Sequence, residues 1–556
     1  MLQQYYLEFL KKHIYQYILF AILHIYVPLS SIALPHYYGK LISTLKGGDI
    51  DAIQKVFIML IGIWITIQTL NIAKSYLNAN LYPKFIGYVR EKIINRVIDS
   101  YKGDYEDLKT GKLLTKIIDS PYIFYHMAKE TKNLLVNNLI VYLSTLGYLF
   151  YYDKFIGMIY IISVVVVCYI TYVYINQCKP YIRDSEESYT DSNEEVDDAI
   201  SNLLSIYSSN TIKDEKGRLQ EYNINYIKAE KSLYDCNNKY RIYFSIAFVI
   251  IFIVLNFFSL KIYLDNTIKL DVLVSIVIIN YSILTGFMSI FYDTKDFIDN
   301  KERLDILEDY LDKMPKIIKN TRNGPLKTNQ VFAKPFVNIE FKNITFKYQE
   351  KNILQNFNLH IKPKEKIGLI GNIGSGKSTL VKLIVGLKSN YTGQILINGK
   401  DIKSLNIDKL RNFISYIPQH PKLFNRTLYE NITYGLENVS EKKIYQTLTK
   451  VNLESIRDIF KRIMHKKVGK NGSKLSGGQR QIVWLIRSLL KDNRMIILDE
   501  PTSSLDEDNK MKVVRLIEEL SKSRNIILIT HDNAILKNMN RIIKLKEGKI
   551  IEDKIV

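Results

Sequence analysis

Long apolar stretches dominate the first half of the chain. Six of them lack Asp, Glu, Lys and Arg over about 18 residues or more, the length that a helix needs to cross a hydrocarbon core. They lie at about 13–39, 56–73, 133–152, 155–178, 242–260 and 272–292. A soluble protein can bury one such helix, but six in this region cannot all be core helices. The pattern therefore predicts an N-terminal all-α transmembrane domain of six helices over residues 1–315.

The connections between these six spans alternate in length. Short loops join spans one and two, three and four, and five and six, whereas about 60 residues with a helical pattern follow the second and the fourth. Both long connections are rich in Lys and Arg, which favour the cytoplasmic side. We therefore expect both connections and both termini in the cytoplasm. The first apolar run is too long for a cleavable signal peptide, and residues 1–12 form either an interfacial amphipathic helix or a frayed terminus.

The hydrophobic period changes from Val337 onward. Short β-rich runs at 337–348, 366–371, 393–399, 413–419, 494–500, 525–531 and 542–553 alternate with helical patterns. Such alternation is typical of an α/β domain with a largely parallel sheet. A polar segment with Gly324 and two prolines precedes the first of these runs. We therefore expect a linker over 316–335 and an α/β domain over 336–556.

A glycine-rich loop follows the strand predicted at 366–371 and leads into a helix. Its residues are Gly371, Asn372, Ile373, Gly374, Ser375, Gly376, Lys377, Ser378 and Thr379. A P-loop requires this strand–loop–helix order, because its backbone N–H groups cradle phosphate oxygens at a helix N-terminus. Lys377 would contact the β- and γ-phosphates, and the Ser378 hydroxyl would bind Mg²⁺. The sequence therefore predicts a P-loop NTPase domain that binds ATP and Mg²⁺.

Two adjacent carboxylates, Asp499 and Glu500, end an apolar run at 495–498. In P-loop NTPases an acidic residue at a strand end binds Mg²⁺, and Asp499 fits this role, with a water between them. Glu500 can polarise the attacking water as a general base. Such a pair is a weak signal alone and a strong one downstream of a P-loop.

The segment Leu475, Ser476, Gly477, Gly478 and Gln479 spells LSGGQ just before the strand that ends in Asp499. Here the sequence resembles the ATP-binding cassette (ABC) family, whose signature is LSGGQ. The resemblance implies that this segment closes on the γ-phosphate held by a partner's P-loop. By position, it implies adenine stacking for Tyr348, Mg²⁺ and water sensing for Gln419, a D-loop across the dimer for Ser504, Leu505 and Asp506, and γ-phosphate contact for His531.

The resemblance covers the whole chain, because six spans with two long extensions and one cassette look like an exporter-type half-transporter. It implies ATP-driven export of an amphipathic, lipid-like or peptide substrate, by dimerisation of the nucleotide-binding domains and alternating access. It also implies short coupling helices near 100–114 and 202–213. A second copy of the chain is the expected partner, because its P-loop, Glu500, His531 and signature are all intact. A homologous half-transporter is the alternative.

Three other interpretations fit the sequence less well. A regulatory or channel-type member of the same family would bind ATP without pumping, which the intact Glu500 disfavours. Importers usually have separate permease and cassette chains, and the six spans exclude a soluble ABC-type ATPase acting on DNA. Lys470 departs from the exporter pattern, which has an acidic residue at this position before the signature; this reversal puts the usual contact to the coupling helices in doubt, and neutral drift is the favoured explanation.

Composition adds a large positive charge to this picture. The chain has 556 residues, with Lys+Arg 77 against Asp+Glu 56, a formal net charge of +21. Because many of these residues lie in the two long connections, a lipid bilayer surface explains the excess and we expect no nucleic-acid partner. Three cysteines are too few for a disulfide framework. Polar residues inside the spans are expected to form interhelical hydrogen bonds more often than substrate contacts: His24, Gln68, Asn71, Asn137, Asn138, Asn256 and Asn280.

Overall fold

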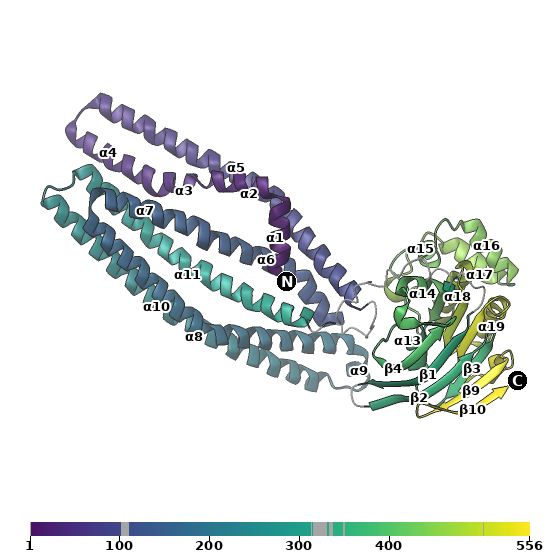
Figure 1. The fold of residues 1–556 in the computed structure, drawn as a ribbon. Helices are drawn as coiled ribbons and strands as arrows, with labels where there is room; N and C mark the ends of the chain where they lie inside the picture. Colours follow the sequence, from purple (N-terminus) through teal and green to yellow (C-terminus); the bar gives the residue numbers. More distant parts are fainter. Residues whose placement is uncertain are drawn as a thin grey trace. The chain divides into compact units, whose positions relative to one another are not determined.

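The computed structural model describes residues 2–101, 110–312, 314, 331–332, 337–348, 351–503 and 505–556. The chain divides into two compact units, one with residues 1–97 and 107–314 and the other with residues 98–106 and 315–556. The first unit is helical and carries the apolar spans, and the second is an α/β domain (Figure 1). The predicted fold class is therefore confirmed.

Long helices build the first unit. They are α1 (Leu2–Lys12), α2 (Ile14–Leu23), α3 (Tyr26–Pro28), α4 (Leu34–Gly47), α5 (Ile50–Ser100), α6 (Thr110–Lys132), α7 (Asn138–Tyr152), α8 (Lys154–Ser201), α9 (Leu203–Ser208), α10 (Ile212–Leu264) and α11 (Leu270–Asp312). Two π-helical turns, η1 (Leu29–Ala33) and η2 (Asn133–Asn137), continue into α4 and α7.

Six continuous helical segments are long and apolar enough to cross a membrane. They are Ile14–Gly47, Ile50–Ser100, Ser120–Tyr152, Lys154–Ser201, Ile212–Leu264 and Leu270–Asp309. Each contains one of the six predicted spans. Helices α5, α8 and α10 have 51, 48 and 53 residues, which at 1.5 Å per residue is about 70–80 Å, more than twice the thickness of a hydrocarbon core. They therefore continue far beyond the lipid as helical extensions.

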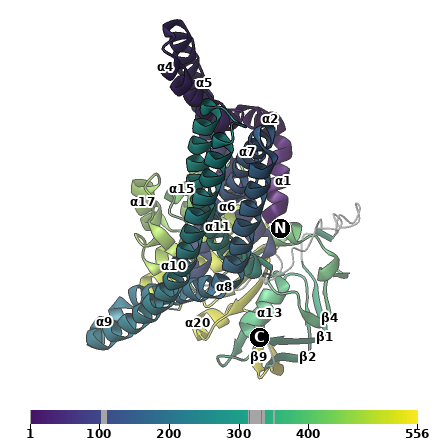
Figure 2. The ribbon, with the colours of Figure 1, turned by 90° about the vertical axis from the view of Figure 1, so that its left-hand side faces the viewer.

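Of the two predicted coupling segments at the ends of these extensions, the structure describes the second. Short helix α9 lies within the second predicted coupling segment, between α8 and α10 at the far end of that helix pair (Figure 2). Its Leu204 and Tyr207 side chains are exposed. Residues 102–109, in the first predicted coupling segment, lie outside the described residues. Near the N-terminus, α1 is a helix whose buried Phe9 packs on Phe85 of α5, with ring centroids 5.1 Å apart.

Polar contacts join the long helices inside the bundle. The Asn280 amide of α11 donates to Asn256 Oδ1 of α10 at 3.2 Å, as expected for an interhelical pair. Tyr174 of α8 donates to Asn237 Oδ1 of α10 at 3.0 Å. One turn away, Cys178 of α8 and Cys236 of α10 form a disulfide, and Cys168 is free. A disulfide framework was excluded from the sequence, and this single pair was not predicted.

Two sheets form the second unit. One has the order β2-β1-β4-β5 and the other β10-β9-β3-β8-β7-β6. The strands are β1 (Ile339–Tyr348), β2 (Lys351–Ile361), β3 (Lys366–Gly371), β4 (Tyr391–Ile397), β5 (Lys400–Asp401), β6 (Ile414–Ile417), β7 (Met495–Asp499), β8 (Asn525–Ile529), β9 (Arg541–Lys546) and β10 (Lys549–Ile555). The six-stranded sheet is parallel except for the β9–β10 hairpin, as predicted. Strand β2 and the separate antiparallel sheet were not predicted.

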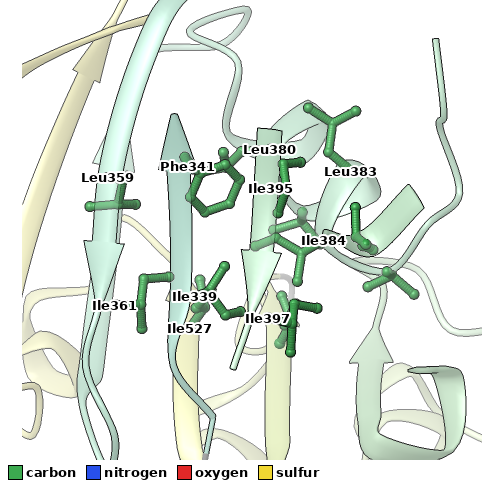
Figure 3. Packing of buried hydrophobic residues seen from close by; sticks show 14 of the residues in the cluster. Ile339, Phe341, Leu359, Ile361, Leu380, Leu383, Ile384, Ile395, Ile397 and Ile527 are labelled. Carbon is green, nitrogen blue, oxygen red and sulfur yellow. The ribbon is translucent and has the colours of Figure 1, made fainter. Parts of the chain in front are cut away.

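Helices cover the two sheets and close the core. They are α13 (Lys377–Ile384), α14 (Ile407–Phe413), α15 (Leu428–Ile432), α16 (Glu441–Lys450), α17 (Glu454–Ile463), α18 (Gly477–Leu490), α19 (Glu507–Ser521) and α20 (Asn533–Leu536), with 3₁₀ turns η3 (Ile402–Ser404) and η4 (Lys470–Gly472). All residues of β7 and β8 are buried, as is typical of parallel strands covered on both faces. Leu380 and Ile384 of α13 pack against Ile395 and Ile527 (Figure 3). This core fixes the strand ends that carry the site.

Candidate nucleotide-binding and hydrolysis site

The predicted phosphate loop connects β3 to α13 at the carboxyl end of the parallel sheet. Gly374 and Gly376 have φ values of +81° and +100°, which residues with a side chain rarely adopt. A Cβ on Gly371 would lie 2.3 Å from the Leu545 carbonyl oxygen. The loop therefore requires glycine at these three positions: at Gly374 and Gly376 because of their φ values, and at Gly371 because β9 approaches so closely.

The Lys377 ammonium lies inside this loop. It donates to the carbonyl oxygens of Gly371 and Asn372, the latter at 3.0 Å, and to Ser375 Oγ at 3.4 Å. The residue is 9% exposed, and burial lowers the pKa of its ammonium. Carbonyl oxygens thus hold the Lys377 ammonium, the positive charge that an anionic phosphate would neutralise.

The two residues predicted to bind Mg²⁺ on α13 and β7 are brought together. The Asp499 carboxylate lies near the Ser378 side chain and accepts a hydrogen bond from Tyr416 Oη at 3.2 Å. Burial raises the pKa of this carboxyl. Hydroxyl and carboxylate oxygens are the ligands that Mg²⁺ prefers, so the pair fits the ion. Gln419, the third predicted ligand, lies two residues beyond β6, whose Ile417 pairs with Leu498 of β7.

Glu500 and His531 follow two neighbouring strands, β7 and β8. Glu500 has a φ of +48°, a conformation uncommon for residues other than glycine. Its N–H donates to the Ile529 carbonyl oxygen at 2.9 Å, and its carbonyl oxygen accepts from Ser503 Oγ at 2.9 Å. These bonds hold its side chain with Oε1 3.7 Å from His531 Nε2. Burial raises the pKa of the Glu500 carboxyl, which makes it a stronger base than an exposed glutamate.

The LSGGQ segment forms the start of α18. Ser476 is its N-cap: Ser476 Oγ accepts from the Gln479 N–H at 3.2 Å, while Gln479 Oε1 accepts from the Ser476 N–H at 3.0 Å. Arg480 donates to the Leu475 carbonyl oxygen at 2.7 Å. The cap pre-forms a helix N-terminus, which favours a negative charge in front of it.

Gly478 packs the signature helix against α19. A Cβ at Gly478 would lie 2.9 Å from Asn509 Cβ, whereas one at Gly477 would meet nothing within 4 Å. Asn509 is itself held by Asp506, the N-cap of α19, whose carboxylate accepts from the Asn509 N–H at 2.8 Å. Asp506 and the signature therefore form one rigid surface. Ser504, in the predicted D-loop, lies outside the described residues.

The remaining predicted residues lie at the edges of the unit. Tyr348 ends β1 with 36% of its surface exposed, and Lys388 Nζ lies 5.5 Å from its ring centroid. Lys470 is exposed in η4, where Gly469, Asn471 and Gly472 all have positive φ. Sequence reasoning missed Tyr416, whose contact with Asp499 depends on the pairing of β6 with β7.

Family comparisons agree with this geometry in both units. The model of the ABC transporter transmembrane region matches residues 17–288, and the ABC transporter model matches residues 354–503. This chain belongs to the ABC transporter family. It is therefore an integral, multi-pass membrane protein that binds ATP and couples ATP hydrolysis to transport.

Similar proteins support the same assignment. A protein of Rickettsia typhi named as an export ATP-binding/permease protein is 25% identical over 98% of this chain and 94% of its own length. A lipid A-core flippase of Neisseria meningitidis is 38% identical over 216 residues, which are 38% of this chain and 35% of the flippase. The solved structure of a bacterial Atm1-family ABC exporter with ATP bound has a TM-score of 0.85 at 18% identity, covering 98% of this chain and 95% of that one. The chain thus has the fold of an exporter half-transporter, a type that generally dimerises.

Proposed function

We propose that two copies of this chain form an ATP-driven exporter with two nucleotide sites, each made by the P-loop of one copy and the signature of the other. The observation that carries the proposal is that one chain holds both halves of a nucleotide site. The phosphate-binding and hydrolytic residues lie at one sheet edge, and the signature begins a capped helix. Lys377, Asp499, Glu500 and His531 occupy neighbouring strand ends, and Ser476 begins α18. A homodimer then has two intact sites.

Each group has a role that its surroundings support. The P-loop N–H groups and Lys377 bind phosphates, and Tyr348 stacks on adenine. Ser378, Asp499 and Gln419 would hold Mg²⁺; Gln419 is included because it follows β6, which pairs with β7. When bound, Mg²⁺ neutralises charge that develops on the phosphates. Glu500 accepts a proton from the attacking water, and His531 orients it against the γ-phosphate. The signature and Asp506 of the partner close the site, and α9 transmits that closure to the spans.

The direction and cargo follow from different evidence. Lys and Arg in the long extensions favour the cytoplasm for these helices and for both termini. The whole-length similarity to an export protein and the partial similarity to a lipid flippase favour export of an amphipathic or lipid-like molecule. Among the described residues within the spans, uncharged polar groups such as Asn138, Ser30 and Ser282 line a cavity of about 470 Å³.

ATP turnover in lipid nanodiscs tests the proposal. Wild type, Glu500→Gln and the exposed control Glu552→Gln are compared with Mg²⁺ across a panel of peptides, lipids and amphipathic compounds. We expect Glu500→Gln to lose about 10²-fold or more in turnover, the contribution typical of a general base, and Glu552→Gln to match wild type. Stimulation by one compound class would name the cargo. ATP binding without turnover in wild type would instead support a regulatory member or a heterodimer.

A further inference from the structure

A large cavity in the first unit lies outside the spans. It has a volume of about 690 Å³ and is lined by α6, α8, α10 and α11, which lie side by side in the bundle (Figure 1). Its walls come from residues 120–126, 185–197, 226–230 and 300–307. Each of these ranges falls outside the predicted span of its helix, so the cavity is in the helical extensions. Its volume is that of a site for a drug-sized ligand.

The walls of this cavity are acidic in a strongly basic chain. Four carboxylates line it, Glu186, Glu194, Asp197 and Glu230, against one guanidinium, Arg303. With His126 neutral, the four minus the one leave a formal charge of −3, whereas the whole chain carries +21. The basic composition of the chain therefore does not explain the negative charge of the cavity walls.

Arg303, the one cation among the described lining residues, is already engaged. Arg303 Nε lies 2.6 Å from Glu186 Oε1, across the gap between α11 and α8. Beside Glu186 on α8, the buried Ser185 hydroxyl donates to Glu230 Oε2 of α10 and fixes that carboxylate. The negative charge is thus held in place by the helices that carry it, and the described residues that line the space include no second Lys or Arg.

Aromatic and aliphatic surfaces complete the lining. Tyr122, Tyr189 and Tyr226 contribute rings, and those of Tyr189 and Tyr226 are 5.6 Å apart at an angle of 52°. The face of an aromatic ring attracts a cation, and the attraction grows as water is excluded. Leu304 and Leu307 supply apolar contact on α11. Carboxylates, ring faces and aliphatic side chains together suit a cation that has an apolar body.

An inorganic cation fits less well than an organic one. Within the part of the chain that the structure describes, no three His, Cys, Asp or Glu side chains converge closely enough to hold a metal ion. A divalent metal needs several oxygen ligands at about 2.0–2.6 Å, which a cavity of this width does not offer. The four carboxylates are instead spread along α8 and across to α10, an arrangement that suits a larger ligand.

We propose that this acidic cavity binds a small organic cation, an ammonium or phosphonium centre carrying apolar groups. If the chain exports as proposed above, the cavity is a loading site for such a molecule and makes amphipathic cations a substrate class. Binding itself does not depend on that role, and the two statements can fail separately.

A charge-matched pair of probes tests binding. Tetraphenylphosphonium and tetraphenylborate have nearly the same shape and opposite charge, and each is titrated calorimetrically into nucleotide-free full-length protein in nanodiscs, with empty nanodiscs as the blank. We expect saturable binding of the phosphonium, at least tenfold tighter than any binding of the borate, and weaker at high salt because charge contributes to it. Equal or tighter binding of the borate, or no saturable phosphonium binding above the blank, would overturn the proposal.

Substitutions locate the site within the protein. The Glu230→Gln/Asp197→Asn double variant removes two wall charges and is expected to weaken phosphonium binding about tenfold, at the effective dielectric of a partly solvated site. Asp191→Asn on α8 removes one charge, as Asp197→Asn does, but away from the lining, and it should bind like wild type. Should the double variant not fold, Asp197→Asn alone, on an exposed side chain, is expected to weaken binding about threefold. Wild-type affinity in the folded double variant, or in that single variant, sinks the assignment.

ATPase assays on the same samples separate this proposal from transport. Phosphonium-stimulated turnover that Glu500→Gln abolishes and Glu230→Gln/Asp197→Asn reduces would support both the site and its role in export. Binding without stimulation would keep the cation site and remove its role as a loading site. A turnover response in wild type that the double variant retains in full would place the cation elsewhere.

Discussion

Gly477 offers a direct test of the proposed dimer, because a single chain gives it no reason to be glycine. It is exposed at the first turn of α18, its φ is not positive, and a Cβ there would meet nothing within 4 Å. Replacing an exposed helical glycine by alanine gains about 0.5–1 kcal/mol. The folding of one chain therefore predicts that Gly477→Ala is neutral or stabilising.

The nucleotide sandwich predicts a different effect on turnover. If the partner's γ-phosphate lies against the N–H groups of Gly477 and Gly478, an added methyl enters a closed site. Overpacking by one methyl costs about 1–3 kcal/mol, which corresponds to about a 5- to 150-fold loss. Gly477→Ala should thus raise or keep the melting temperature of nucleotide-free protein while lowering its turnover at least fivefold.

Gly478→Ala is the matched neighbour that separates the two effects. Its Cβ would lie 2.9 Å from Asn509 Cβ and Cγ. Gly478→Ala should therefore lower the free energy of unfolding by about 1 kcal/mol, net of the helix-propensity gain, and with it the melting temperature, even without nucleotide. Adding Asn509→Ala should restore that loss. Scanning calorimetry and ATPase rates on the same nanodisc samples give both quantities. Wild-type turnover in a folded Gly477→Ala variant would refute the idea that another chain approaches this residue.

Three further predictions follow from the described contacts. In the disulfide pair, thiol labelling under denaturing conditions should count one free cysteine, Cys168, before reduction and three after it, and three before reduction would contradict the pairing. Arg541 holds both oxygens of Asp553 at 2.6 Å and lowers the pKa of that carboxyl. The stabilisation that this pair gives is complete at a pH above the ordinary aspartate pKa, and it is lost as the pH falls through the lowered pKa. Asp553→Asn should therefore flatten the acid side of a plot of melting temperature against pH. An unchanged plot would exclude the effect. Ser476→Ala, which removes an N-cap, should cost about 1 kcal/mol by the same calorimetry, and no change would show that Gln479 alone sustains the cap.

The parts of the site that were predictable from sequence are local. The P-loop, the Asp499–Glu500 pair and the signature are each read from fewer than about ten consecutive residues, because their chemistry needs consecutive backbone groups. The contact between Tyr416 and Asp499 depends on strands 83 residues apart and cannot be read from either one. The disulfide likewise needs the register of α8 against α10 across 58 residues.

Strand β2 was missed for a different physical reason. Its sequence KNILQNFNLHI carries three asparagines, which are depleted in strands. Asn356 has a φ of +45° and the β1–β2 pairing shifts register at several points, so the alternation of apolar and polar residues is broken. The asparagines supply the bonds that a regular ladder loses: the Asn343 N–H donates to Asn358 Oδ1 at 2.8 Å. Tertiary packing of Leu354 and Phe357 decides the strand where propensity does not.

The resting contacts of Lys377 connect nucleotide binding to the order of events at the site. Its ammonium is held by the carbonyl oxygens of Gly371 and Asn372, which are neutral acceptors, and a phosphate offers a charged acceptor at the same place. An ammonium attracts a charged phosphate oxygen more strongly than a neutral carbonyl oxygen, so binding exchanges weaker bonds for stronger ones without moving the loop that its glycines fix. The capped signature helix is also formed before any partner arrives. Neither half of the site needs to refold, and the free energy of binding phosphate is therefore left to bring two chains together.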